Sequence, residues 1–446
     1  MTTRRDFLKT AALSTAALSF SGLPGFSARS YKNIMGANER INIGAIGVNS
    51  RGSALAQSFA KLDGCNVNYV CDVDSRAIDK CGKALEEITK TRATGVKDIR
   101  ELVEKKDLDA VLIATPDHWH APAALMAMKA GKDVYLEKPC GHSPSEGEIL
   151  IQATAKYNRV LQMGNQRRSW PNIIEAIQQV RNGAIGDVHF GKCWYTNRRP
   201  PIGRGNKVDV PDYLDWDLWQ GPAPREEYRD NIVHYKWHWF WNWGTGEALN
   251  NGTHMVDLLR WGMDLDYPTL VQSTGGRYYY NDDWETPDTQ IINLDFGNGK
   301  SMMWEGHSCN SHPIEGYTVG LMFYGSEGNM LIGGNNSYKQ LDLNGKVVKE
   351  VKSEIKIDPR NLMNPAQQLD AYHLQNFLDG IRKSATLNAD ITSGHISTLL
   401  VQLGNISQRV GGHSLSVDST NGHILNNKKA KKLWKRKYEK GWEMKL

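Results

Sequence analysis

Residues 41–52 read INIGAIGVNSRG and predict the start of a nucleotide-binding fold. An apolar strand runs to Ile46, a glycine-containing turn follows, and a helical pattern begins after Gly52. In such a turn Gly47 permits the sharp bend, while Gly52 lets helix and strand pack closely and the helix N-terminus meets a pyrophosphate. The middle glycine of the usual pattern is Asn49, which tolerates left-handed backbone better than most residues. The turn is therefore compatible with a dinucleotide.

Strands and helices alternate after this turn, which predicts a parallel sheet. The strand from Val67 to Cys71 ends at Asp72, at about the spacing from Gly47 that a ribose-binding carboxylate needs. That carboxylate would repel a 2′-phosphate, which favours NAD over NADP. A helix is expected from Pro122 to Ala130, with the proline at its start. Further strands are expected at residues 110–114, 133–136 and 160–163.

The second half of the chain predicts an antiparallel sheet. Four segments have period-two or apolar character, and Gly297-Asn298-Gly299 is typical of a hairpin turn. A helix is expected at residues 367–382, packed near the junction of the two halves. The four strands are expected at residues 289–296, 300–306, 317–324 and 329–332.

Charge and cysteine usage exclude some classes of function. The formal net charge of +5 comes largely from Lys428 to Lys440, so nucleic-acid binding is not expected. Aromatic residues in and after this run, Trp434, Tyr438 and Trp442, predict that it docks on its own protein or on a neighbouring subunit. The six cysteines lack paired metal spacing and are expected to be free, buried thiols. His118 and His120 have no carboxylate partner set, so no metal site is predicted.

The first residues read as a targeting segment. Arg4 and Arg5 precede the run Ala11 to Leu23, which is too short for an ordinary membrane span. We interpret residues 1–37 as a twin-arginine export signal and expect a periplasmic protein. No later segment is apolar enough to span a bilayer. An exported enzyme cannot draw on a free NAD pool, so a tightly held cofactor that is recycled in place is expected.

Two stretches at strand ends carry a family resemblance. They are TPDHWH at residues 115–120 and EKP at residues 137–139. Together with residues 47–52 and Asp72, they resemble the Gfo/Idh/MocA oxidoreductases. The similarity spans residues 40–411. It is greatest to secreted, Bacteroidota-type members, whose W-x-W-F-W segment is similar to residues 237–241.

The resemblance implies a two-domain architecture. A Rossmann domain (α/β, with a doubly wound parallel sheet) would precede an α+β domain with a large open, mostly antiparallel sheet, and the active site would lie in the cleft between them. It also implies a homo-oligomer formed through the sheet domain. The expected segments are a signal at 1–37, an NAD-binding domain at 38–165, a substrate and oligomerisation domain at 166–411, and a basic tail at 412–446.

The resemblance and the strand ends together assign the cofactor site. The expected cofactor is tightly bound NAD. The expected cofactor-binding residues are Gly47, Asn49, Ser50, Arg51, Asp72, Thr115, Pro116, His118, His120, Glu137, Lys138, Asn165 and Gln166.

Two residues are the predicted catalytic groups. Lys138 follows a parallel strand at the edge where such sheets bind ligands, and its pKa could fall near the positive nicotinamide. By resemblance, His254 would be the acid-base group at the reacting hydroxyl. The family's aspartate four residues earlier is Asn250 here, which can orient groups but cannot act as a base. The expected substrate-binding residues are Lys138, Arg167, Trp194, His238, Trp241, Asn250 and His254.

Three functions remain open at this point. The first is hydride transfer between NAD and a secondary hydroxyl of a sugar or glycoside, with the ring 3-position as one candidate. The second is glycoside hydrolysis by transient oxidation, elimination and re-reduction on bound NAD. The third is a non-catalytic sugar-binding protein that retains NAD. The abundance of Trp and Tyr suits a sugar partner in all three, because aromatic faces pack on sugar rings.

Overall fold

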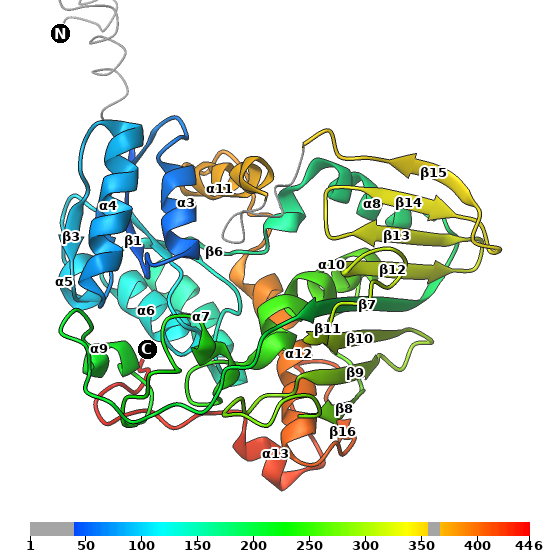
Figure 1. Ribbon diagram of the computed structural model, residues 1–446. Helices are drawn as coiled ribbons and strands as arrows, with labels where there is room; N and C mark the ends of the chain where they lie inside the picture. Colours follow the sequence, from blue (N-terminus) through cyan, green and yellow to red (C-terminus); the bar gives the residue numbers. More distant parts are fainter. Residues whose placement is uncertain (1–39, 356–365) are drawn as a thin grey trace, which may run out of the picture. The chain divides into compact units, whose positions relative to one another are not determined.

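The first sheet is a parallel Rossmann sheet with strand order β3-β2-β1-β4-β5-β6 (Figure 1). The structure, a computed structural model, describes residues 40–355 and 366–446. The strand order reverses between β1 and β4, so a crevice forms at their carboxyl ends. The strands are β1 Ile41–Ile46, β2 Cys65–Cys71, β3 Thr94–Val96, β4 Ala110–Ile113, β5 Asp133–Leu136 and β6 Leu161–Met163. The helices are α3 Arg51–Phe59, α4 Ser75–Thr89, α5 Ile99–Val103, α6 Asp117–Lys129 and α7 Pro144–Tyr157.

The second sheet has ten strands and is mostly antiparallel. Its order is β15-β14-β13-β12-β7-β10-β9-β8-β16, with β11 paired to β7, and only the β7–β10 pair is parallel. The strands are β7 Val188–Arg198, β8 Leu270–Gly276, β9 Thr289–Asp295, β10 Ser301–His307, β11 Cys309–Asn310, β12 Val319–Gly325, β13 Asn329–Gly333, β14 Tyr338–Leu341, β15 Val347–Val351 and β16 Leu415–Ser416. The predicted fold class is confirmed.

Helices cover one face of this second sheet (Figure 1). In β10 the buried residues alternate with partly exposed ones, as a strand with one covered face requires. The covering helices share one large apolar core with the strands. The covering helices are α8 Pro171–Arg181, α10 Thr253–Met263 and α12 Ile391–Arg409. Elsewhere in the chain lie the short helical segments η2 Gln166–Ser169, α9 Trp216–Gln220, η3 Lys236–Trp239, η4 Ala248–Gly252 and α13 Lys428–Lys432.

Helix α11, Gln367–Ile381, packs against the Rossmann domain although it follows the second sheet in the chain. Its residues Leu374, Phe377 and Leu378 are fully buried in the same apolar cluster as Phe59 of α3. The helix predicted at 367–382 therefore lies beside the junction, as expected. It completes the core of a domain whose strands lie more than two hundred residues earlier in the sequence.

Helix α6 begins earlier than the sequence predicts. It starts at Asp117, so Pro122 lies inside the helix rather than at its start. Because proline has no N–H, the carbonyl of His118 loses its helical hydrogen bond. Arg436 Nη2 donates to that carbonyl at 2.6 Å. The hydrogen bond that Pro122 cannot make is thus replaced by one from Arg436, near the C-terminus.

The segment predicted as a basic tail docks on the Rossmann domain. Arg436 Nε forms a buried ion pair with Glu146 Oε1 at 2.6 Å, and the Tyr438 hydroxyl donates to the same oxygen at 2.6 Å. The other carboxylate oxygen of Glu146 accepts from the backbone N–H of His142 at 2.6 Å. The tail also differs from the expected boundary, because residues 415–416 form strand β16 of the second sheet.

Removing one tail hydrogen bond should measurably destabilise the protein. Tyr438→Phe deletes a donor to the buried Glu146 carboxylate, and hydrogen bonds to charged groups contribute about 1.5–3 kcal/mol. We expect the free energy of unfolding to fall by about that amount in urea denaturation. Tyr278→Phe is the matched control, because that side chain is 71% exposed. Equal stability of the two variants would contradict the tail's role.

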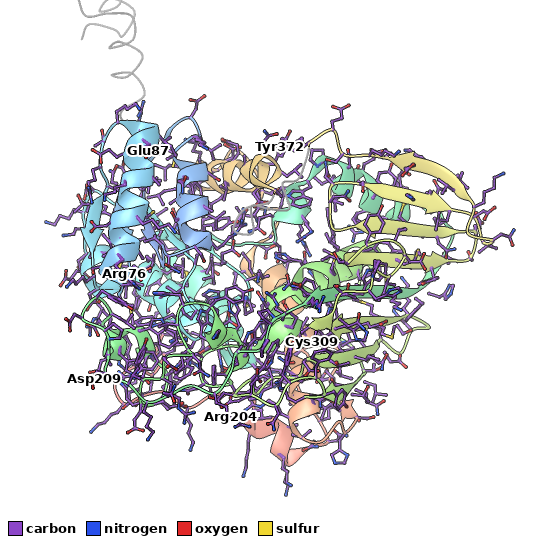
Figure 2. All side chains as sticks on the ribbon, viewed as in Figure 1. Arg76, Glu87, Arg204, Asp209, Cys309 and Tyr372 are labelled. Atoms are coloured by element: carbon purple, nitrogen blue, oxygen red, sulfur yellow. The ribbon has the colours of Figure 1, made fainter. Side chains whose placement is uncertain are left out.

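The segment between β7 and η4, residues 199–247, forms a separate tryptophan-rich cluster. It is tied to the loop after β2: Ser75 N donates to Tyr213 O and Asp215 N to Val73 O, both at 3.0 Å. Arg76, labelled in Figure 2, lies with its guanidinium carbon 3.3 Å from the centre of the Tyr213 ring. The 199–247 segment thus closes over the end of the Rossmann sheet.

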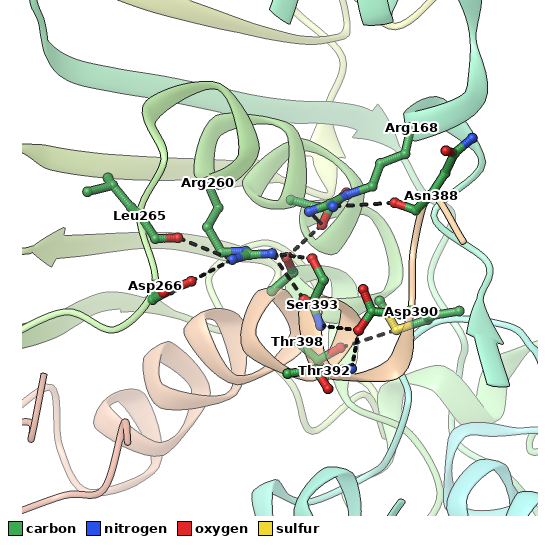
Figure 3. A network of polar contacts seen from close by, with 12 residues as sticks. Arg168, Arg260, Leu265, Asp266, Asn388, Asp390, Thr392, Ser393 and Thr398 are labelled. Carbon is green, nitrogen blue, oxygen red and sulfur yellow. Dashed lines mark hydrogen bonds and ion pairs between the residues drawn. The ribbon is translucent and has the colours of Figure 1, made fainter. Parts of the chain in front are cut away.

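A buried polar network fixes η2 against α10 and α12 (Figure 3). Both Arg168 Nε and Nη2 donate to the Asp257 carboxylate at 2.8 Å. The hydroxyl of Ser397 donates to Asp257 Oδ1 at 2.6 Å and accepts from Arg260 Nε at 2.9 Å. Asp390 caps α12 by accepting from two of its first backbone N–H groups. The network therefore holds together the elements that carry Arg167 and His254.

Two sequence expectations concern the chain as a whole. All six cysteines are free and buried, as expected. Within residues 40–355 and 366–446, no helix combines the length and apolarity needed to cross a bilayer. The predicted signal, residues 1–37, lies outside the described residues.

Candidate functional site

A cavity of about 820 Å³ lies at the carboxyl ends of the Rossmann strands. Its walls come from the loops after β1, β2, β4 and β5, from the 199–247 segment, and from η2, η4 and α10. This volume is in the range of cofactor and ligand sites. The cavity brings together most of the predicted residues: Gly47, Asn49, Ser50, Arg51, Asp72, Thr115, Pro116, His120, Glu137, Lys138, Gln166, Arg167, His238, Asn250 and His254.

The backbone of the glycine turn requires glycine at both of its ends. Gly47 has φ +78°, and a Cβ there would lie 2.7 Å from the carbonyl oxygen of Ala114. A Cβ on Gly52 would collide with the carbonyl oxygen of Gly47. Asn49 does not have a positive φ, so its tolerance of left-handed backbone is not needed. The turn therefore keeps its form with asparagine at the middle position.

Asp72 is held in place at the end of β2. Its Oδ2 accepts from Val48 N at 2.8 Å and its Oδ1 from Asp74 N at 3.0 Å. The neighbouring Asp74 caps α4 and pairs with both Arg76 and His234. Arg76 is therefore engaged by a carboxylate other than Asp72, and Asp72 lines the cavity.

Glu137 and Arg51 belong to one buried ion-pair network. Arg51 Nε lies 3.3 Å from Glu137 Oε1, and its Nη2 lies 2.9 Å from Asp370 Oδ2 on α11. Gln166 Nε2 donates to Glu137 Oε1 at 2.7 Å. Asp370 is a cavity residue that the sequence analysis missed. The network joins α3, the strand end of β5, η2 and α11 around the cavity.

Lys138 reaches across the cavity to the second domain. Its Nζ donates to the carbonyl oxygen of Asn250 at 2.5 Å and lies 3.3 Å from Asn250 Oδ1. Burial lowers the pKa of Lys138 below its ordinary value, while the nearby carboxylates of Glu137 and Asp117 oppose that shift. Since an ammonium group has three donors, one remains for a bound oxygen atom.

His254 faces the cavity with no hydrogen bond to any described residue. Its Nδ1 is buried without a partner, which leaves Nε2 to meet a ligand. Burial lowers the pKa of His254 well below 6.5, and the positive charges of Arg167 and Lys138 lower it further. The imidazole is therefore neutral at pH 7 and able to accept a proton.

A buried carboxylate that the sequence analysis missed lies behind these groups. Glu247 pairs with Arg199 Nε at 2.9 Å and accepts from the side-chain amides of Asn250 and Asn251. It thereby orients the amide that occupies position 250. Arg199 and Asn251 line the cavity beside it, together with Tyr195 and Tyr235.

Four predicted site residues lie outside the cavity. Trp194 is fully buried on the sheet face opposite the helices, because side chains alternate along β7; its neighbour Tyr195 faces the cavity instead. Trp241 packs under Arg409. The His118 ring lies 3.0 Å from Trp219 O and so ties α6 to the 199–247 segment. Asn165 is buried behind the wall with no partner for its amide among the described residues.

The ring nitrogens of His118 and His120 face protein carbonyls rather than a metal site. His120 lies 2.6 Å from Pro139 O and 2.8 Å from Thr115 O, which ties the two predicted loops together. Burial lowers the pKa of His118 to about 3 and that of His238 to about 3. In the described part of the chain, no group of three or more His, Cys, Asp or Glu side chains is placed to hold a metal ion.

Family models match both halves of the chain. Residues 41–165 match the oxidoreductase family with an NAD-binding Rossmann fold, and residues 211–415 match that family's C-terminal alpha/beta domain. This chain belongs to the Gfo/Idh/MocA oxidoreductase family. The family resemblance drawn from residues 47–52, 115–120 and 137–139 is thereby confirmed, as is a Rossmann domain of the NAD-binding type.

Relatives of this Gfo/Idh/MocA member include proteins named for glycoside cleavage. A glycosyl hydrolase family 109 protein of Saccharopolyspora erythraea is 31% identical over 208 residues, covering 43% of this chain and 45% of the relative. An alpha-N-acetylgalactosaminidase of Shewanella oneidensis is 29% identical over 212 residues, with the same coverage. The chain spans less than half the length of these relatives.

Solved structures share the two-domain fold. A myo-inositol dehydrogenase from Lactobacillus casei, in complex with NAD(H) and myo-inositol, has a TM-score of 0.61 at 17% identity, covering 85% of this chain and 97% of that one. An oxidoreductase domain protein from Kribbella flavida has a TM-score of 0.65 at 18% identity, covering 85% and 99%. These likenesses show the fold.

Proposed function

We propose that this Gfo/Idh/MocA member moves a hydride between NAD and a secondary hydroxyl of a sugar or glycoside. One observation carries the proposal: neutral His254 and cationic Lys138 face the same cavity whose other end holds the glycine turn and Asp72. A base and a cationic donor at one hydroxyl are what alcohol oxidation requires.

The residues present fit NAD. The glycine turn leaves room for a pyrophosphate at the N-terminus of α3, and Asp72 is placed for the adenine ribose. The buried Thr115 hydroxyl oxygen has no partner among the described residues, so it can bond to a ligand. Arg76, the arginine nearest Asp72 in the sequence, is engaged by Asp74, which supports NAD over NADP.

The protein groups would divide the proton chemistry between them. Bound NAD supplies the hydride acceptor and, in reverse, the donor. His254 takes the hydroxyl proton on Nε2, because its neutral ring has no competing partner. Lys138 donates its remaining N–H to the developing alkoxide, while Asn250, held by Glu247, fixes the lysine. Residues of the 199–247 segment form one wall of the cavity.

The proposed base predicts the pH dependence of oxidation. The neutral form of His254 is active, and its pKa lies well below 6.5, so protonation should begin only at lower pH. We therefore expect kcat/KM for oxidation to stay flat from pH 8 down to pH 6.5. A fall in kcat/KM centred at the ordinary histidine pKa would contradict the assignment.

Hydrolysis is the second candidate function, and the names of the relatives favour it. The same residues would support transient oxidation of a ring hydroxyl, elimination of the aglycone, addition of water and re-reduction, with no net change in redox state. The relatives named as glycosyl hydrolases match less than half of their length, so their activity reaches this chain only as a proposal.

Mass spectrometry of a glycoside panel incubated with the NAD-loaded protein tests both candidates. Loss of two hydrogens from an intact glycoside would support net dehydrogenation. Release of the aglycone together with an unoxidised sugar would support hydrolysis. No change in any glycoside, with NAD still bound, would contradict both and favour a binding protein.

We further propose that the protein is exported to the periplasm, holds its NAD tightly and recycles it in place. The support is the twin-arginine pattern at Arg4 and Arg5, together with a cavity whose walls come from both the Rossmann loops and the 199–247 segment. Retention of NAD through prolonged dialysis is the expected result. Association through the open sheet also remains a proposal, tested by the mass of the protein in solution.

A further inference from the structure

One wall of the cavity carries an arginine without a counter-ion. Arg167 on η2 makes no hydrogen bond or ion pair with any residue in 40–355 or 366–446, and its Nε is buried. Its guanidinium carbon lies 5.1 Å from the centre of the Trp170 ring, whose Nε1 is also buried without a partner. Two adjacent cavity residues thus carry N–H donors that no described acceptor satisfies.

The other arginines of the cavity are neutralised. Arg51 pairs with Glu137 and Asp370, and Arg199 pairs with Glu247. Arg167 has no such ion-pair contact. Burial lowers its pKa to about 10, and the Asp370 carboxylate, which pairs with Arg51, only partly opposes that shift. The guanidinium is therefore charged at pH 7. A half-buried cation without a partner is costly, and the cost is offset when a ligand supplies the anion.

The unpaired charge lies beside the proposed base. Arg167 is the charged group that most strongly opposes protonation of His254, and Lys138 and Arg51 act in the same direction. Position 250, which contacts Lys138, is an amide and contributes no negative charge. The substrate end of the cavity is therefore positive around the reacting group.

We propose that the substrate is an acidic sugar and that Arg167 binds its single negative charge. The group would be a ring carboxylate, as in a uronic acid, or a sulfate monoester. This inference rests on the proposed function, because it names the substrate class of the same site. A planar guanidinium matches a carboxylate or ester oxygen pair with two parallel hydrogen bonds.

An acidic substrate would also assist the proposed base. Burial lowers the pKa of His254 most, and the positive charges of Arg167 and Lys138 lower it further. A negative charge on Arg167 offsets this second contribution, so the imidazole can better keep the proton that it takes from the hydroxyl. The titratable and charged groups that face His254 are Arg167, Lys138, Arg51 and His373. Neutral sugars would leave that field uncompensated.

Calorimetric binding to the NAD-loaded protein tests the inference without turnover. The probes are the methyl glycosides of glucose, glucuronic acid and glucose 6-sulfate, with the galactose series beside them. We expect at least one acidic sugar to bind about 10-fold or more tightly than its neutral counterpart at low salt. The tighter of the two acids identifies the substituent. Equal or tighter binding of the neutral sugars would overturn the inference.

Variants assign the preference to Arg167. Arg167→Gln should lower the ratio of acidic to neutral affinity to near one, and Arg167→Lys should retain part of it because the charge remains. Arg92→Gln, an exposed arginine, is the matched control and should keep the full ratio. A preserved ratio in Arg167→Gln would overturn the assignment; should that variant not fold, an undiminished ratio in Arg167→Lys would count against fork-like binding.

The proposed function and this inference fail in different ways. An acidic preference in binding, with no oxidation or cleavage of any sugar, would reject the function and keep the inference. Oxidation of neutral glycosides with no preference for acidic ones would keep the function and reject the inference.

Discussion

Lys138→Met should lower kcat by about 10³-fold while NAD remains bound. The lysine Nζ supplies the donor for the developing alkoxide, and removing such a donor costs about 10²–10³ in kcat. NAD should stay because the Lys138 ammonium contacts Asn250 rather than the glycine turn. Single-turnover conversion of a responsive glycoside, followed by mass spectrometry, measures the rate.

The control for this experiment is Lys156→Met, a lysine on the outer surface of α7 that lies near Tyr157. It should match the unsubstituted protein in both rate and NAD content. A loss below about 10-fold in Lys138→Met would reject the catalytic assignment. Loss of NAD together with activity would place Lys138 in cofactor binding instead.

Asp257→Ala should lower the free energy of unfolding by about 3–5 kcal/mol. The Arg168 side chain is only 8% exposed, and the change removes its carboxylate partner. Leaving a buried charge unpaired costs about 3–5 kcal/mol. The change also removes the acceptor for the Ser397 hydroxyl in the buried polar network. Urea denaturation followed by fluorescence and circular dichroism measures the loss.

An exposed ion pair provides the comparison. Asp79→Ala breaks the pair with Arg92, where both side chains are largely in water, and should change stability by less than about 1 kcal/mol. Asp257→Asn keeps the shape and should fall between the two. If Asp257→Ala lost no more than Asp79→Ala, the buried network would not be a source of stability.

Local patterns predicted the Rossmann half well. An apolar strand, a glycine turn and a helix lie within one short window, and β1, β4 and β5 begin at the residues that the sequence predicts. The error at Pro122 arose because a proline inside a helix needs an outside donor, here Arg436 from 318 residues away. The residues next to the proline do not predict a partner so distant in the sequence.

The site was predictable only where a motif or a strand end marks it. Lys138 and His254 line the cavity, as expected. Glu247 was missed because its partner Arg199 is 48 residues distant in the sequence, so nothing next to Glu247 predicts the ion pair. Trp194 was chosen over Tyr195 because the alternation of β7 decides which of two neighbouring aromatics faces the cavity, and β7 was not recognised as a strand.

The hydrogen bond from Arg436 to the carbonyl of His118 also sets an order of events during synthesis. Chains emerge from the ribosome at about 5–20 residues per second, and the early domain begins to fold first. The His118 carbonyl in α6 gains its protein donor only when Arg436, 318 residues later, has been synthesised. Until then α6 has a carbonyl without its protein donor. For most of that time α11, which completes the core of the Rossmann domain, has not been synthesised either. The Rossmann domain should therefore reach its full stability only after translation has passed residue 436.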